Sequence, residues 1–132
     1  MLNVGVTKAG TYPGYYLVVA QGMSAAWLTK IYAEAKSNIP DAFVAIDPYW
    51  PDMMLNKDIP KLLALTPMPV LDINTEWSNN LASHTASERQ MEAKKSLKML
   101  YRQRLLTGPN ALHKQSHRIS REIHGWLTHM GW

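Results

Sequence analysis

The chain alternates between two kinds of apolar segment, and this alternation restricts its fold more than any other feature of the sequence. Short, continuously apolar runs rich in β-branched residues predict strands that are covered on both faces. Longer segments whose apolar residues recur every three or four positions predict helices that pack by one face. Strands are expected at 15–20, 42–46 and 70–73, and helices at 24–35, 56–65, 85–97 and 117–130, the last with Ser116 as its N-cap.

Strands that alternate with helices predict an α/β fold. We expect a three-layer, mostly parallel sheet of about four strands flanked by helices, with chemistry at the carboxyl ends of the strands. Met99–Leu106 fits neither period and is open between the end of a helix and a fourth strand. Pro48 and Pro51 predict a loop at 49–54, and Thr85 and Glu88 have the spacing of a capping box.

A chain of 132 residues normally forms one core, so we expect a single domain over 1–132. Residues 1–14 are expected to be irregular, with at most one short strand at Leu2–Val6. The absence of cysteine excludes disulfides, thiolate zinc sites and a cysteine nucleophile. No apolar run is long enough to cross a bilayer, and no signal-peptide pattern opens the chain, so we expect a soluble protein whose compartment stays open.

The net charge of +4 is concentrated in the second half of the chain. Residues 1–66 hold five bases and five acids, whereas 67–132 hold nine bases and five acids, and between Ser87 and Arg121 the nine bases face only Glu88 and Glu92. We interpret this stretch as a solvated helix face and a basic edge strand. Nucleic-acid binding is not favoured, because aromatic residues are not interleaved with the bases.

The turn after the first predicted strand carries the sharpest motif. Ser24 opens a helix directly after a buried strand, with the small residues Gly22 and Ala26 two positions before and after it. This arrangement predicts a nucleophile elbow in which Ser24 projects from the turn and the backbone N–H of Ala25 offers half of an oxyanion hole. The alternative reading is that Ser24 only caps the helix.

Five segments together resemble the C-terminal half of an α/β-hydrolase and, more narrowly, a bacterial family of uncharacterised α/β-hydrolase-like proteins. The segments are VVAQGMSAAWL (18–28), PDAFVAIDPYWP (40–51), PVLDINTEW (69–77), YRQRLLTG (101–108) and ISREIHGWL (119–127). The resemblance covers roughly 15–130. It implies that 99–106 contains the last strand and that the protein is bacterial, either cytoplasmic or periplasmic.

The resemblance also implies a catalytic order of serine, acid and histidine. The acid position points to Glu76 or, less directly, to Asp72, which lies inside a strand and is expected to make a structural hydrogen bond. His113 and His117 both follow the last strand, and we prefer His113 because a helix dipole disfavours the protonated form of His117. In the hydrolase hypothesis, Ser24 attacks an ester or a similar small acyl substrate, His113 is the general base and Glu76 orients it.

Several other residues have assigned places in the prediction. Trp50 and Trp77 belong to loops at the carboxyl edge and are expected to line an apolar pocket. Trp27 and Trp126 are expected in the core, and Asp47 and Asp52 are expected to organise a turn. The histidine spacing does not complete a metal site, so neither a metal nor a cofactor is expected.

A hydrolase of this fold would have four further strands and the second oxyanion donor before the elbow, where this chain offers only Met1–Gly14. Loss of one such donor costs about 10²- to 10³-fold in rate. The chain is then a fragment or a derivative without catalysis, and a non-catalytic binding module that uses its sheet edge or the basic 87–121 stretch is the competing hypothesis. Because the first strand would have a bare edge, we expect a homodimer through a sheet edge or a helix face.

Overall fold

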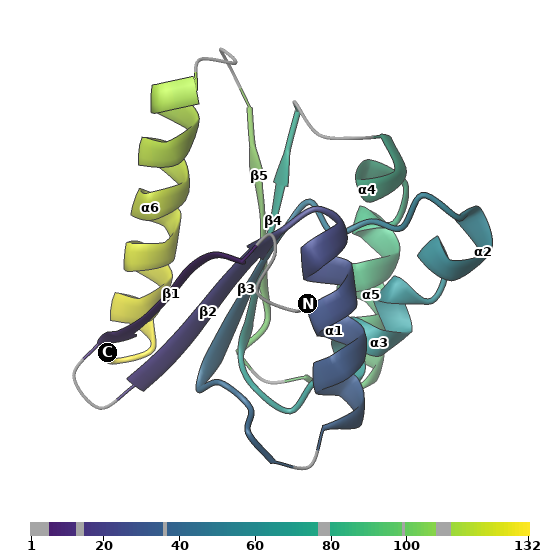
Figure 1. Ribbon diagram of the computed structural model, residues 1–132, viewed down its shortest axis with the longest axis horizontal. Coiled ribbons are helices and arrows are strands. Elements are labelled where there is room, and N and C mark those ends of the chain that lie inside the picture. Colours follow the sequence, from purple (N-terminus) through teal and green to yellow (C-terminus); the bar gives the residue numbers. More distant parts are fainter. Residues whose placement is uncertain (1–5, 13–14, 36, 77–79, 99, 108–111) are drawn as a thin grey trace.

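The computed structural model describes residues 6–12, 15–35, 37–76, 80–98, 100–107 and 112–132, and only the backbone of 6–12 and 112–115. Five strands form one sheet in the order β1-β2-β3-β4-β5 (Figure 1). The strands are β1 (Val6–Tyr12), β2 (Tyr15–Gln21), β3 (Ala42–Ile46), β4 (Val70–Thr75) and β5 (Arg102–Leu106). The four strands β2 to β5 run parallel, and β1 pairs antiparallel with β2.

Helices cover both faces of the sheet, so the predicted three-layer α/β fold is confirmed. The helices are α1 (Met23–Glu34), α2 (Met53–Asn56), α3 (Ile59–Leu65), α4 (Asn80–His84), α5 (Ala86–Lys95) and α6 (Leu112–His129). The helices α1 to α5 lie on one side of the sheet and α6 lies on the other (Figure 1). Successive parallel strands step in one direction across the sheet, which places their connecting helices on the same face.

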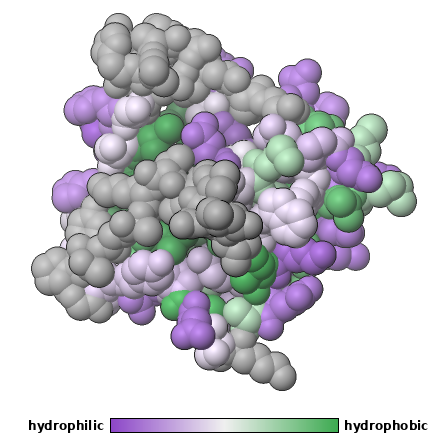
Figure 2. Space-filling model, in the orientation of Figure 1, coloured by the Kyte–Doolittle hydropathy of each residue, from purple (hydrophilic) through white to green (hydrophobic). Residues whose placement is uncertain are grey.

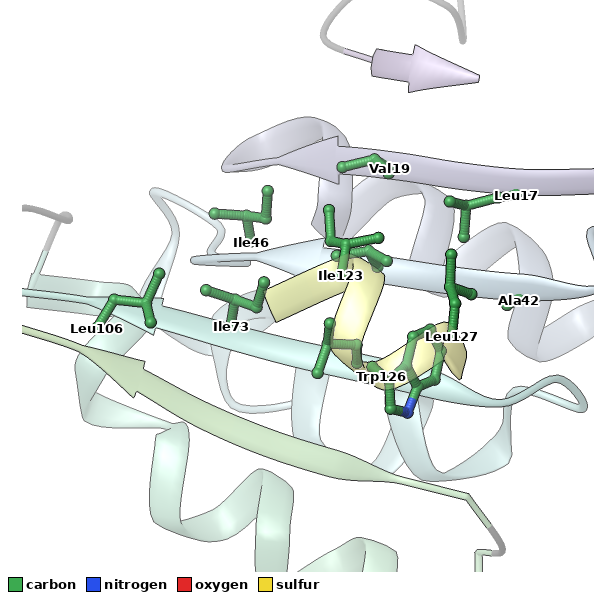
Figure 3. Packing of buried hydrophobic residues seen from close by; sticks show 11 residues of the cluster. Leu17, Val19, Ala42, Ile46, Ile73, Leu106, Ile123, Trp126 and Leu127 are labelled. Atoms are coloured by element: carbon green, nitrogen blue, oxygen red, sulfur yellow. The ribbon is translucent and has the colours of Figure 1, made fainter. Parts of the chain in front are cut away.

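Alternating residues of the strands feed two separate cores. In β2, Val18 and Ala20 pack with α1 and α3, whereas Leu17 and Val19 face α6. The apolar residues predicted to form one face of the last helix do so: Ile123, Trp126 and Leu127 are buried and point toward the sheet (Figure 3). Because β3 is buried on both faces, it has the continuously apolar sequence that the prediction relied on.

The amino-terminal segment differs from the prediction. Residues 6–12 form a full edge strand, where only a short strand at Leu2–Val6 within an irregular segment was expected. Six residues of β1 pair with β2, so the edge of β2 that was expected to be bare is covered. The segment has few apolar residues and contains Gly10, which is why its sequence carried no strand signal.

Helix boundaries also differ from the prediction in physically clear ways. The predicted helix at 56–65 is α3, which begins only at Ile59. A separate helix, α2, begins inside the predicted loop because the Asp52 carboxylate accepts from the backbone N–H of Met54 at 2.8 Å. Pro60 lies in the first turn of α3, where its missing N–H costs nothing. The last helix begins at Leu112, so Ser116 is not its N-cap. The ambiguous segment 99–106 contains β5, as the resemblance implied.

Candidate functional site

The turn between β2 and α1 lies at the carboxyl edge of the sheet and bends at one residue. Gly22, and not Ser24, is the residue at the bend, with φ 65° and ψ −133°, and its N–H donates to the Ile46 carbonyl at 2.8 Å. That conformation is one that side-chain-bearing residues rarely adopt. The N-cap of α1 is Gly22, and Ser24 is the second residue of the helix. The alternative prediction that Ser24 caps the helix is therefore wrong.

Ser24 and Ala25 lie in the first turn of α1. Intrahelical hydrogen bonding begins with the N–H of Ala26, which donates to the Gly22 carbonyl at 3.2 Å. The amide of Ala25 therefore belongs to the group of N–H donors at a helix start that have no intrahelical acceptor. The Ala25 side chain is buried and Ser24 is half-buried.

The predicted acid and base also follow carboxyl ends of strands. Glu76 is the residue directly after β4; it is exposed, and its N–H donates to the Leu106 carbonyl at 3.2 Å. Because β3 lies between β2 and β4, the strands that lead to Ser24 and Glu76 are about 10 Å apart. His113 is in the first turn of α6 and its side chain is outside the described residues, while His117 is exposed on the same helix.

The predicted pocket tryptophans have different surroundings. Trp50 is buried and packs with Ala26 and Ile59 beneath α1 and α3. Trp27 was expected in the core but is 48% exposed. It packs edge-on against Trp50 from the solvent side, with ring centroids 4.5 Å apart. Trp77 lies outside the described residues.

A small cavity of about 240 Å³ lies between α6 and the carboxyl ends of β2 and β3. Its polar side chains are Gln21, Ser116 and Ser120, and its other walls are apolar. Ser24 and Glu76 are not among its lining residues. The cavity is therefore a different part of the carboxyl edge from Ser24 and Glu76.

Asp47 holds the ends of two strands together at this edge. Its carboxylate accepts from the backbone N–H of Thr75 at 2.8 Å and from the Thr75 hydroxyl at 2.7 Å. Burial raises the pKa of Asp47, and the hydrogen bonds from Thr75 oppose that rise. Both carboxylate oxygens thus have structural partners, which lie on the neighbouring strand β4 and not in the turn that Asp47 was expected to organise.

A buried polar network surrounds Asp72, and the sequence predicted the structural role of Asp72 but not its partner Arg89. One carboxylate oxygen accepts from Arg89 Nε at 2.8 Å, from the Tyr101 hydroxyl at 2.6 Å and from Gln103 Nε2 at 3.0 Å. Asp72 and Arg89 are both fully buried, and burial beside Asp72 raises the pKa of Tyr101. The position of Asp72 inside a strand signalled its structural role, whereas nothing in the polar sequence of α5 signalled a buried arginine.

Arg89 also binds residues that precede α5 in the chain. Its guanidinium donates to the Ala82 carbonyl at 2.9 Å, to the Thr85 hydroxyl and to Asn74 Oδ1. Thr85 precedes α5 as the capping-box spacing predicted, but its side chain makes no cap hydrogen bond to the helix. The Thr85 hydroxyl instead helps to hold Arg89 against the sheet.

Within the described ranges, no three His, Asp or Glu side chains come together in a way that could hold a metal ion. In the same part of the chain, no helix has the length and hydropathy needed to span a membrane.

Comparison with known proteins places the chain in a family. Neither a curated protein nor a solved structure matches the chain significantly. A family match covers residues 6–129, a range that includes every strand and helix described above. The chain therefore belongs to the family described as protein of unknown function (DUF3530).

Proposed function

We propose that the protein is an α/β-hydrolase-like binding module that does not hydrolyse its ligand. The observation that carries the proposal is the identity of the residue at the bend after β2. In a nucleophile elbow the nucleophile occupies this strained position, and here the position belongs to Gly22, which has no side chain. A turn of this shape without a nucleophile is compatible with binding and lacks the group that would form an acyl intermediate.

The order of the strands supports the hydrolase-like assignment. The four parallel strands are neighbours in sequence order, each is followed by at least one helix, and the first ends in the sharp turn. This is the arrangement that the resemblance to the C-terminal half of an α/β-hydrolase implies. Fold likeness alone does not carry an activity, so the proposal rests on the turn.

Serine hydrolysis is the second candidate function. The favouring observation is that Ser24, Glu76 and His113 each follow the carboxyl end of a parallel strand, in the chain order of the hydrolase triad. In that case Ser24 would attack a small acyl substrate, with His113 as base, Glu76 as its orienting acid and the Ala25 amide as oxyanion donor.

A fluorophosphonate probe distinguishes the two candidates. We expect no labelling of the wild-type protein above the level of a Ser24→Ala variant, because the bend carries no nucleophile. Ser120→Ala is the matched control, since Ser120 is a helical serine beside the carboxyl-edge cavity. Labelling that disappears in Ser24→Ala and persists in Ser120→Ala, measured by intact-mass spectrometry, would establish the hydrolase and overturn the binding-module proposal.

We also propose that two copies of the chain associate. A homodimer was expected because the edge of β2 would be bare, but β1 covers that edge. The better support is a set of exposed apolar side chains on α1 and α2, which we call the apolar patch, namely Met23, Trp27, Met53, Met54 and Leu55. Figure 2 shows pale green, moderately hydrophobic side chains projecting from the surface where Figure 1 places α2.

A further inference from the structure

A groove between α5 and the edge strand β5 is separate from the carboxyl-edge turn. Its volume is about 510 Å³. Gln90, Ala93 and Lys94 line it from α5, and Tyr101, Arg102 and Gln103 line it from the other side. Two of these residues, Tyr101 and Gln103, are fixed by their hydrogen bonds to Asp72, so one wall of the groove is preorganised.

The strand that borders the groove lies at an edge of the sheet. β5 pairs only with β4 among the described strands and ends the sheet. Its backbone groups on the outer side are therefore available to hydrogen-bond another extended chain. A helix beside a free strand edge is an arrangement that binds extended peptides by strand addition, with the backbone giving affinity and the groove giving specificity.

Among the described residues that line the groove, every charged one is basic. Within the described part of the chain, neither Lys94 nor Arg102 forms an ion pair, whereas Arg104 pairs with Glu122 at 3.1 Å. The register with β4 sets Arg102 opposite Leu71 and Gln103 opposite Asp72, so the side chains of Arg102 and Gln103 project to opposite faces of the sheet.

Lys98 has a structural task in the same region. Its Nζ donates to the Met68 carbonyl at 2.8 Å and to the Thr66 carbonyl, and burial lowers its pKa to about 8. The amine is still mostly protonated at pH 7 and adds positive potential, but its donors are directed to the backbone. Beside it Leu97 is 82% exposed and gives the groove an apolar rim.

We propose that the groove between α5 and β5 binds an extended acidic peptide segment, which joins the sheet as a strand next to β5. Acidic side chains on one face of that segment would meet Lys94, and those on the other would meet Arg102. This inference rests on the proposed binding function and assigns it a site and a class of ligand. Charge favours an acidic partner over a second copy of β5, because self-pairing would bring the arginines of two basic strands together.

Fluorescence anisotropy with short labelled peptides tests the proposal. The first probe is an octapeptide of Glu and Thr residues; the second has Lys in place of Glu; the third has Pro at two central positions. We expect binding of the acidic probe only, because Lys repels the groove and Pro removes the N–H groups that a strand must donate. Lys94→Gln and Arg102→Gln should each weaken binding about twofold to fivefold.

The control variant is Lys61→Gln, which removes an exposed charge from α3 and should leave the affinity unchanged. Equal binding of the Pro-containing probe would overturn strand addition, and absence of binding by all three probes would overturn the site. Tighter binding of a single-stranded oligonucleotide of the same length would assign the groove to nucleic acid instead. Labelling of Ser24 with peptide binding intact would overturn the proposed function alone, so the two failures are distinguishable.

Discussion

At the scale of single residues, Gly22 is the residue at the bend between β2 and α1. A Cβ added to Gly22 would lie 3.5 Å from Tyr49 Cε1, which is an ordinary contact. Space therefore does not require glycine at this position. The backbone conformation does, because φ 65° with ψ −133° is strongly disfavoured for residues with a Cβ.

Gly22→Ala should consequently lower the free energy of unfolding by about 1–3 kcal/mol through backbone strain alone. Gly125→Ala is the matched control: Gly125 is an exposed residue of α6 with nothing within 4 Å of an added Cβ. That substitution should raise stability by about 0.5–1 kcal/mol. Urea unfolding of the two variants measures both changes, and equal stability of the two would show that Gly22 is not conformationally strained.

The sequence alone does not show whether Gly22 or Ser24 lies at the bend of this turn. The five residues from Gly22 to Ala26 have a small residue at each end and Ser24 in the middle, and the five from Ala20 to Ser24 have the same pattern with Gly22 in the middle. The choice depends on where β2 ends. The strand was predicted to end at Ala20 and continues to Gln21, in register with Ile46 of β3.

At the scale of elements, α5 is attached to the sheet by a buried ion pair rather than by an apolar face. Removing one partner of such a pair leaves an uncompensated charge in the interior. Arg89→Met should therefore cost about 3–5 kcal/mol of unfolding free energy. Lys95→Met on the same helix removes an exposed pair with Glu92 and should cost less than about 1 kcal/mol.

Urea titrations followed by far-ultraviolet circular dichroism give both values. Similar, small losses for Arg89→Met and Lys95→Met would show that the Asp72–Arg89 pair does not hold α5. The test also bears on the peptide groove, because Tyr101 and Gln103 share the same carboxylate oxygen of Asp72 as Arg89.

Strands and helices marked by a pattern of apolar residues could be predicted from the sequence. Features that depend on polar side chains could not. The ends of β3 were predicted at the observed residues, since a strand covered on both faces must be apolar throughout. The boundaries of α2 and α6 were not: the prediction placed Asp52 in a turn, where it caps α2, and α6 begins four residues before its predicted cap, Ser116. Arg89 could not be found, because an inward-facing arginine in a polar helix has the same local pattern as an outward-facing one.

At the scale of the whole molecule, the two exposed features lie on different elements. The apolar patch belongs to α1 and α2, and the basic edge belongs to β5 and α5. We expect self-association to use the apolar patch and leave β5 free for a different partner. The separation makes the two associations independently testable.

Met54→Lys should raise the dissociation constant of the dimer at least about tenfold, since Met54 is 71% exposed and its burial in an interface would contribute roughly 1.5–3 kcal/mol. Leu105→Lys, at the 64% exposed side chain on β5, should leave dimerisation unchanged. Light scattering at high micromolar concentration checks both. A monomeric wild-type protein would contradict the dimer, and dissociation by Leu105→Lys alone would move the interface to β5.

The pairing of β1 with β2 limits how another protein can extend the sheet. One side of β2 is already hydrogen-bonded to β3 and the other to six residues of β1. A partner strand that approached from this side would have to add outside β1, antiparallel to it or parallel, or else remove β1 first. Growth of the parallel part of the sheet without rearrangement is therefore possible in one direction only, beyond β5.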